Sequence, residues 1–207
     1  MQSQSVGGRS TEYFNANYLR YDRWYETHRN EYNDQIEFLR TIIPGSDGIE
    51  IGVGTGRIAV ALNIRFGLDS SPEMLKLARS RGVETFLGDA YDTKLPDKAF
   101  DYSLFYLTLC FLQQPVKAIK EAYRISKKVI SVILDRECAY VQGIMKDPTG
   151  FYTFAKFYTE REIVDFYTRA GLKVTGKTEK DLKTSSGILY KLIAMKRVLS
   201  SAKDGIP

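Results

Sequence analysis

The sequence has few of the residues that build covalent or metal-bound frameworks. Its 207 residues include two cysteines and one histidine. Cys110 and Cys138 are too few for a disulfide framework, and together with His28 they are too few for a structural zinc site of four ligands. We therefore expect no bound metal.

Long hydrophobic runs are also missing. The longest apolar runs, Leu104–Leu109 and Val129–Leu134, are far shorter than the roughly 20 residues that a membrane helix needs. Residues 1–10 are polar and lack the apolar core of a secretory signal. With 43% hydrophobic and 27% charged residues, the chain is suited to one soluble, cytoplasmic α/β domain without membrane contact.

The net charge is divided unevenly between the two halves of the chain. Residues 1–103 hold 12 Lys and Arg against 15 Asp and Glu, whereas residues 104–207 hold 18 against 10. The net charge of the second half is thus +8, which is compatible with nucleic acid or another anionic partner. A solvated lysine surface explains the same count more simply.

The chain begins with helices and continues with alternating strands and helices. Residues 1–10 are expected to be a flexible lead, and residues 200–207 a frayed tail. Between Thr11 and Ile43, apolar and aromatic residues recur at helical spacing, with a break near Thr27–Asn30, which predicts two helices. The turn at 44–48 then separates this helical cap, residues 11–45, from an α/β core at 46–199.

In the core, the pattern predicts seven strands. They are expected at Ile49–Ile51, Ile64–Leu68, Val83–Leu87, Phe100–Leu107, Lys128–Leu134, Leu172–Thr178 and Ile188–Lys196. Helices are expected at Arg57–Leu62, Pro72–Arg81, Val116–Ile125 and 159–170, with helix plus loop over 137–158. Ser70 and Glu73 fit one capping box, and Thr159 and Glu162 fit another.

This alternation predicts a Rossmann-like sheet, mostly parallel, with helices on both faces. Only a short loop at 179–187 joins the last two strands, which suits an antiparallel hairpin. The last strand is therefore expected to run antiparallel to the others.

A glycine-rich segment between the first strand and the helix after it is the most informative part of the chain. Gly52, Gly54 and Gly56 follow Glu50 in the pattern E-x-G-x-G-x-G. Such glycines let the backbone turn sharply and let a ligand lie against it. A dinucleotide fingerprint would need a third glycine at position 57, which is Arg57, and no Gly-Lys-Ser/Thr of a P-loop follows.

Three acids stand at the ends of three successive predicted strands. Glu50 is suited to an ammonium group, Asp69 to the two hydroxyls of a ribose, and Asp89 to an exocyclic amine such as that of adenine. Each acid alone could be a turn or cap residue. Together they predict a ligand composed of adenosine and an amino acid.

These residues resemble the class I S-adenosylmethionine-dependent methyltransferases, in particular the group with a type 11 methyltransferase domain. The resemblance spans about residues 13–196 and is strongest at 48–115. It implies a seven-stranded sheet with the last strand antiparallel, and S-adenosyl-L-methionine as cofactor with S-adenosyl-L-homocysteine as product. The cofactor-binding positions that it implies are Glu50, Gly52, Val53, Gly54, Gly56, Asp69, Ser70, Met74, Asp89, Ala90 and Phe105, with Tyr106 beside the last of these.

The N-terminal segment of the family often covers the pocket, and aromatic faces suit a sulfonium cation. The resemblance therefore makes Tyr18 and Tyr21 the better lid candidates, although a helix-packing stripe is an equal alternative. The wall specific to the methyl acceptor is expected from Phe111, residues 140–158 and the N-terminal helices.

The chain also departs from the family's motifs. Cys110-Phe111 stands where many members have two histidines, there is no Asn-Pro-Pro-Phe/Tyr motif, and neither cysteine follows a proline. His28 is more simply explained as a packed or surface residue, so no catalytic residue is assigned.

We expect a methyltransferase acting on a small molecule, which the +8 half hints is anionic. Two alternatives stay open: an enzyme acting on RNA or protein, and a module that binds the cofactor without turnover. The oligomeric state and the methyl acceptor are not fixed by the sequence.

Overall fold

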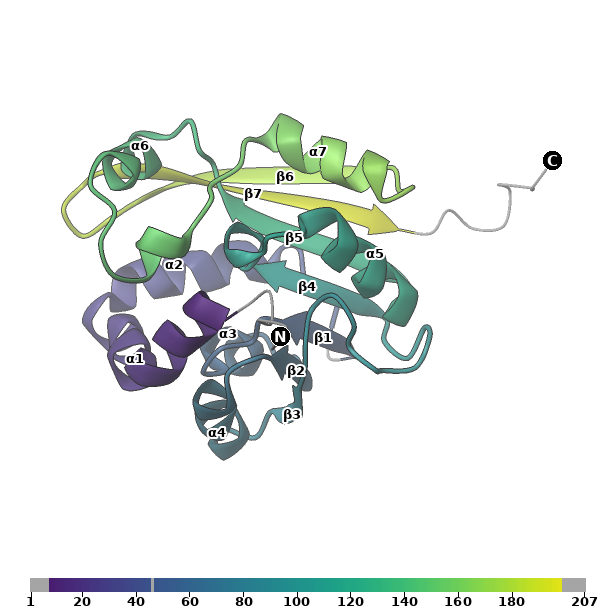
Figure 1. Cartoon of the computed structure of the whole chain (residues 1–207). Coiled ribbons are helices and arrows are strands. Elements are labelled where there is room, and N and C mark those ends of the chain that lie inside the picture. Colours follow the sequence, from purple (N-terminus) through teal and green to yellow (C-terminus); the bar gives the residue numbers. More distant parts are fainter. Residues whose placement is uncertain (1–7, 46, 199–207) are drawn as a thin grey trace, which may run out of the picture.

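The computed structural model describes residues 8–45 and 47–198. Its centre is a seven-stranded sheet of order β3-β2-β1-β4-β5-β7-β6 (Figure 1). The strands are β1 (Gly48–Ile51), β2 (Phe66–Asp69), β3 (Glu84–Leu87), β4 (Tyr102–Tyr106), β5 (Lys128–Leu134), β6 (Gly176–Lys183) and β7 (Leu189–Val198). This is the sheet that the sequence predicts.

The strand directions also match the prediction. β1, β2, β3, β4 and β5 pair in parallel, whereas β7 pairs antiparallel with both β5 and β6. The β6–β7 connection is a tight turn closed by the Gly187 N–H donating to the Thr184 carbonyl at 2.8 Å. Gly187 has φ +82°, which favours glycine at this turn.

Helices cover both faces of the sheet (Figure 1). They are α1 (Gly8–Thr27), α2 (Arg29–Arg40), α3 (Arg57–Ala61), α4 (Pro72–Ser80), α5 (Pro115–Ile125), α6 (Ala139–Lys146) and α7 (Glu160–Arg169), with short 3-10 turns η1 (Leu109–Phe111) and η2 (Gly150–Phe154). Apolar residues of α2, α3 and α4 pack on one face, and those of α5 and α7 on the other.

The side chains of β4 point alternately into these two cores. Leu104 and Tyr106 belong to the cluster under α2, α3 and α4, whereas Phe105 belongs to the cluster under α5 and α7. Successive strand residues point to opposite faces, so neighbours in sequence enter different layers.

The N-terminal helices form the expected cap, which begins earlier than predicted. α1 starts at Gly8, so residues 8–10 of the predicted lead are helical, while residues 1–7 and the predicted tail at 200–207 lie outside the described residues. His28 separates α1 from α2, as the break near Thr27–Asn30 predicts. Within α1, Asn17 has non-helical φ and ψ angles, and its side-chain amide donates to the Tyr13 carbonyl at 2.9 Å.

Two other predictions need correction. Ser71, not Ser70, caps α4, because the Ser71 Oγ accepts from the Met74 N–H. The strand expected at Leu172–Thr178 is instead β6 at Gly176–Lys183, so the predicted loop at 179–187 is half strand. β6 is an edge strand with mostly charged residues, so its sequence lacks the apolar period that marks the inner strands. The Thr159–Glu162 capping box at α7 is confirmed.

No helix in the described part of the chain is long and apolar enough to cross a membrane.

Candidate functional site

A cavity of about 610 Å³ lies at the carboxyl ends of the parallel strands, beneath α1. Its wall includes eight of the residues predicted to bind the cofactor: Gly52, Gly54, Asp69, Ser70, Met74, Asp89, Ala90 and Tyr21. Five predicted residues are not in this wall: Glu50, Val53, Gly56, Phe105 and Tyr18. The structure thus brings the strand-end acids Asp69 and Asp89 to one cavity and places the third acid behind it.

The glycine loop after β1 is left-handed at all three glycines, with φ between +53° and +80°. Two of them are fixed by close packing. A Cβ on Gly52 would stand 2.3 Å from the Thr108 methyl group, and one on Gly56 would stand 2.9 Å from the Ala78 backbone. These glycines let the loop fit between η1 and α4.

Gly54 has a different surrounding. A Cβ there would meet only the Tyr21 ring, at 3.6 Å, on the cavity side. The bare backbone at Gly54 therefore leaves room for a ligand between the loop and α1.

Asp69 ties this loop to β2. Its Oδ2 accepts from the Gly54 N–H at 2.8 Å, and its Oδ1 accepts from the Ser71 N–H at 2.9 Å. Burial raises the pKa of Asp69, while the N–H groups of Ser71, Gly54 and Ser70 act in the opposite direction. A carboxylate has about four acceptor positions, so each oxygen retains capacity for a further donor such as a hydroxyl.

Glu50 lies behind the glycine loop and is 2% exposed. Its Oε2 is buried and has no hydrogen-bond partner among the described residues. Burial raises the pKa of Glu50 well above its usual range, and the charge of Asp69 raises it further. A buried carboxyl oxygen without a donor is costly, and a cationic group brought to the loop would relieve that cost. The residue present therefore fits an ammonium group.

The segment that follows β3 contributes Asp89 and Ala90 to the cavity wall. Asp89 is exposed and lies beside Ala90 in the cavity wall. Its Oδ1 accepts from the Tyr91 N–H at 2.9 Å, which fixes the turn that carries it. Its other carboxylate oxygen remains available to a donor group.

The remaining predicted residues have structural positions. Val53 supports the loop from beneath and leaves no room for a Cβ on Gly67, which would stand 2.7 Å from a Val53 methyl group. Phe105 is fully buried in the cluster under α5 and α7, and its neighbour Tyr106 takes the place in the cavity wall. Tyr18 is partly exposed on α1.

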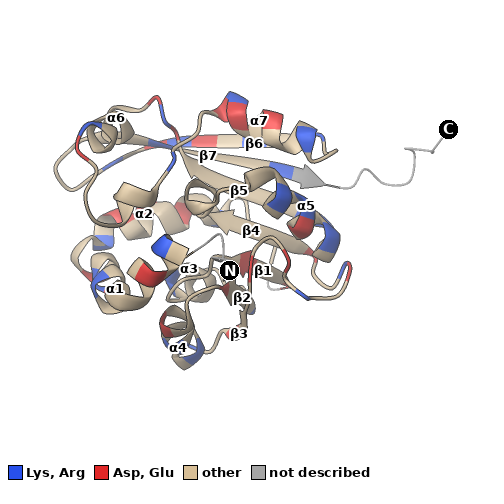
Figure 2. Cartoon of the chain, viewed as in Figure 1, with Lys and Arg blue, Asp and Glu red and all other residues tan. Residues whose placement is uncertain are grey.

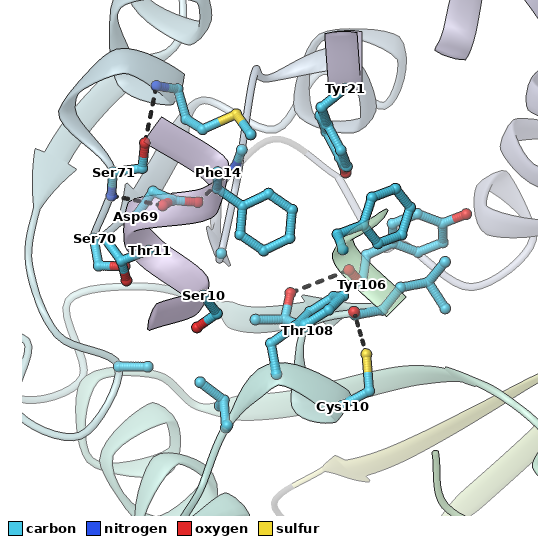
Figure 3. Close-up of a pocket in the computed structure, with 18 of the residues that line it drawn as sticks. Ser10, Thr11, Phe14, Tyr21, Asp69, Ser70, Ser71, Tyr106, Thr108 and Cys110 are labelled. Carbon is cyan, nitrogen blue, oxygen red and sulfur yellow. Dashed lines mark hydrogen bonds between the residues drawn. The ribbon is translucent and has the colours of Figure 1, made fainter. Parts of the chain in front are cut away.

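α1 closes over the cavity through two aromatic side chains (Figure 3). Phe14 and Tyr21 point from α1 into the space between Asp69 on one side and Tyr106 on the other. The Phe14 ring packs edge-on against Phe111 at 5.2 Å between centroids. Of the two lid candidates, Tyr21 lines the cavity and Tyr18 does not, while Phe14 was not singled out by the sequence. We call this part of α1 the lid.

Ion pairs hold this lid on the core. The Asp22 carboxylate on α1 accepts from Arg57 at 2.6 Å and from Arg81 at 2.8 Å. Burial alone would raise the pKa of Asp22, but hydrogen bonds from Arg57 and Arg81 outweigh it and lower the pKa to about 2. The carboxylate is therefore ionised wherever the protein is folded near neutral pH.

Beyond the lid, the cavity continues into an aromatic chamber. We use this name for the part lined by Tyr25, Tyr106, Phe111, Tyr140, Phe151, Tyr152, Phe157 and Tyr190. Phe111 and residues of the segment 140–158, from which the acceptor wall is expected, line this chamber. The chamber wall includes hydroxyl groups that pair with one another, such as Tyr140 with Tyr152 at 3.2 Å.

A buried network of hydrogen bonds lies in the chamber wall, and the sequence does not predict its connections. The Tyr106 hydroxyl donates to Gln35 Oε1 at 2.6 Å, and the Gln35 amide donates to the Tyr190 hydroxyl at 3.1 Å. These three residues come from α2, β4 and β7 and are up to 155 positions apart in sequence, so no local pattern marks them. Glu31, one turn before Gln35, also lines the cavity and accepts from the Ser185 N–H at 2.6 Å.

The charged groups of the cavity wall are carboxylates, namely Glu12, Glu31, Asp69 and Asp89. Its described residues include no Lys, Arg or His. His28 stacks on Trp24 at 4.8 Å between ring centroids, which agrees with its prediction as a packed residue. Cys110 does line the cavity, but burial raises the pKa of its thiol to about 12, so the thiol stays protonated at neutral pH.

Comparison with known proteins agrees with this site. A methyltransferase-domain model matches residues 49–130. An uncharacterised protein of Methanocaldococcus jannaschii is 35% identical over 168 residues, covering 79% of this chain and 82% of that protein. An S-adenosylmethionine-dependent methyltransferase of Thermotoga maritima, described as a possible histamine N-methyltransferase, superposes with a TM-score of 0.81 at 32% identity, covering 90% of this chain and 99% of that one.

A third similarity concerns the fold alone. Magnesium protoporphyrin IX methyltransferase of Synechocystis PCC 6803, solved with bound S-adenosylhomocysteine, has a TM-score of 0.70 at 16% identity and covers 92% of this chain and 98% of that one.

Together, the fold and the glycine loop define a methyltransferase of class I. The chain belongs to the S-adenosylmethionine-dependent methyltransferases with a type 11 methyltransferase domain, and its cofactor is S-adenosyl-L-methionine.

Proposed function

We propose that this enzyme transfers a methyl group from S-adenosyl-L-methionine to a small molecule held in the aromatic chamber. The observation that carries this proposal is that one cavity joins the glycine loop to the chamber, under a lid supplied by the same chain. A small acceptor can enter such a space, whereas a folded macromolecule needs an open surface.

At the cofactor end, each residue has a role that its position supports. Gly54 leaves the backbone open to the methionine part and Gly52 lines the same wall, with the Glu50 carboxyl behind the loop for the ammonium group. Asp69 is proposed to accept from the ribose hydroxyls, and Asp89 with Ala90 to lie at the adenine. Ser70 and Met74 complete this wall. When bound, the cofactor supplies an activated methyl group on a sulfonium centre.

At the acceptor end, the protein's contribution is placement. Tyr106, Gln35 and Tyr190 offer hydroxyl and amide groups that can orient a polar atom of the acceptor, while the rings around them exclude water. An acceptor that presents a nucleophilic atom with a lone pair, or that ionises readily by itself, needs no base, whereas another acceptor would need a wall carboxylate such as Glu31 to take its proton. The wall's lack of Lys and Arg favours an uncharged or cationic group at the reacting end.

The relatives cover several kinds of small acceptor. The Thermotoga protein is described as a possible histamine methyltransferase, and the Synechocystis enzyme acts on a porphyrin. We therefore propose a test with labelled S-adenosyl-L-methionine and a panel of biogenic amines, quinols, phenols and porphyrins, with a total RNA sample and a protein extract as the macromolecular arms.

The expected result is transfer to at least one small molecule and none to RNA or protein, with an acceptor KM that rises in Phe111→Ala. Label transfer only to RNA or protein would replace the small-molecule assignment. Cofactor binding without transfer to any member of the panel would favour the module that binds without turnover.

A further inference from the structure

A second hollow of about 570 Å³ lies beside the cavity, on the face of the sheet covered by α5 and α7. Four residues line both spaces: Cys110, Phe111, Leu112 and Tyr158. The second hollow therefore adjoins the cavity beneath the lid at these four residues.

The second hollow is lined by four cationic side chains. Lys117 and Lys120 lie three residues apart on one side of α5, Lys156 precedes α7, and Arg169 ends α7. Among its described lining residues there is no Asp or Glu. We call these four cations and the hollow between them the cationic groove. Figure 2 shows the basic residues of α5 and of the end of α7 on this face.

Most of this charge is not neutralised within the protein. In the part of the chain that the structure describes, no carboxylate forms an ion pair with Lys117, Lys120 or Lys156. The acid nearest in sequence, Glu121, is instead paired with Arg124 at 2.7 Å. Arg169 does have a partner, Asp165 at 3.4 Å, one turn earlier on the exposed side of α7. Three unpaired cations around one hollow favour an anion.

Local contacts place these lysines with some precision. The backbone N–H of Lys156 donates to the Cys110 carbonyl at 2.7 Å, which joins its segment to η1. The Lys156 ammonium lies 5.6 Å from the Tyr158 ring centre, and the Lys117 ammonium lies 5.7 Å from the Tyr91 ring centre. Tyr91 and Tyr158 both line the cavity as well, so the two cations lie directly outside its wall.

We propose that the cationic groove is an anion-binding subsite that holds a phosphate or carboxylate group of the methyl acceptor. This assignment rests on the proposed function, because it divides the acceptor between two spaces. The uncharged or cationic reacting end lies in the cavity, which has no Lys or Arg in its described wall, and the anionic end lies among the four cations outside. Charge-assisted hydrogen bonds from lysine ammonium groups suit either anion.

The first test measures anion binding directly on the full chain. Inorganic pyrophosphate and citrate are titrated calorimetrically into wild type, into the double variant Lys120→Gln/Lys156→Gln, and into the matched control Lys146→Gln/Lys183→Gln. The control removes the same charge from exposed lysines outside the groove. We expect saturable binding in wild type and control, and an affinity at least about fivefold lower in the groove variant, since each lost charged contact is worth about 0.5–1 kcal/mol.

Two outcomes would overturn the proposal. One is the absence of saturable binding in wild type, or an equal loss in both double variants. The other is an oligoribonucleotide that binds at least about tenfold more tightly than pyrophosphate and loses affinity in the groove variant, which would assign the groove to RNA.

A second test separates this proposal from the proposed function. Pairs of acceptors that differ by one phosphate or carboxylate are compared in the methyl-transfer assay. We expect wild type to favour the anionic member in kcat/KM by about fivefold, chiefly through KM, and the groove variant to lose that preference. Turnover that favours the member without the anion would remove the subsite while the methyltransferase assignment stands. Failure of S-adenosylhomocysteine to bind would instead remove the proposed function, whatever pyrophosphate does.

Discussion

The two ends of the cavity are built from the chain in different ways. The cofactor end comes from three consecutive strand ends, β1 to β3, and its acids and glycines lie within about 40 residues of one another. The aromatic chamber joins α1, α2, β4, the segment 140–158 and β7, which are far apart in sequence. Backbone geometry dominates the first end and side-chain packing dominates the second. Substitutions should therefore affect the two ends separately.

The largest expected effect is on the cofactor end, from Gly54→Val. A β-branched side chain is strained at φ +53°, and it would fill the space between the loop and Tyr21. We expect affinity for S-adenosylhomocysteine to fall by about a hundredfold or more, roughly 2.7 kcal/mol.

Gly171→Val is the matched control for strain. Gly171 also has a positive φ, at +78°, but a Cβ there meets nothing within 4 Å and it lies far from the cavity wall. The Gly171→Val variant should be less stable than wild type and should keep its affinity for the cofactor. Equal losses of affinity in the two variants would show that strain, not the open backbone of Gly54, explains the effect.

The Asp22 ion pairs should stabilise the lid, which covers both ends of the cavity. The folded pKa of about 2 is below the ordinary value of 3.8, so the pairs stabilise the fold above pH 3.8, and this stabilisation is lost as the pH falls toward 2. Asp22→Asn should lower the free energy of unfolding by about 2 kcal/mol at pH 7, with the difference from wild type shrinking below pH 4. Urea unfolding at several pH values measures this.

The exposed Asp165→Asn serves as the control for Asp22, because its pair with Arg169 is on the surface and should contribute little. A pH-independent loss in Asp22→Asn would mean that packing, not charge, holds α1 on the core.

Asp69→Asn is expected to have a smaller and more local effect. The amide can accept at one oxygen only, so either the Gly54 N–H or the Ser71 N–H loses its acceptor, and the ribose hydroxyls lose one of the two acceptor oxygens proposed for them. We expect about a tenfold loss of affinity for S-adenosylhomocysteine, with the chamber unaffected. The exposed Asp92→Asn should bind normally, and normal binding by a folded Asp69→Asn would refute the ribose role.

The smallest effect is expected at the chamber, from Tyr106→Phe. It leaves the buried Gln35 Oε1 without its donor, which should lower the free energy of unfolding by about 1 kcal/mol. The affinity for S-adenosylhomocysteine should stay within about twofold of wild type, whereas acceptor turnover falls. A loss of cofactor affinity as large as in Asp69→Asn would contradict the division of the cavity into two independent ends.

The same comparison explains what the sequence could predict. Gly52 and Gly54 lie just after β1 and Asp69 ends β2, so their spacing fixes their relative places and the pattern marks them. Phe105 and Tyr106 are neighbours on β4, so their side chains point to opposite faces of the sheet. Local spacing does not show which of these faces holds the cavity, because that depends on the helices that cover each face. The predicted bounds of β6 were wrong because an edge strand rich in Lys, Glu and Asp has no regular spacing of apolar residues.

Long-range contacts set the rest. The Tyr106–Gln35–Tyr190 bonds and the convergence of Lys117, Lys156 and Arg169 require the final sheet order and helix packing. The net charge of +8 on residues 104–207 hints at an anionic acceptor. The structure places part of that charge outside the cavity wall, in the cationic groove. The net charge of a segment does not show where its charged side chains lie in the folded protein.

The most direct test of the central claim is calorimetric titration of the full chain with S-adenosylhomocysteine. A cavity whose glycine loop, Asp69 and Asp89 bind the cofactor predicts saturable one-site binding in the micromolar range, and a melting temperature that rises with the concentration of the product. No binding heat and no rise in melting temperature at millimolar concentration would contradict it.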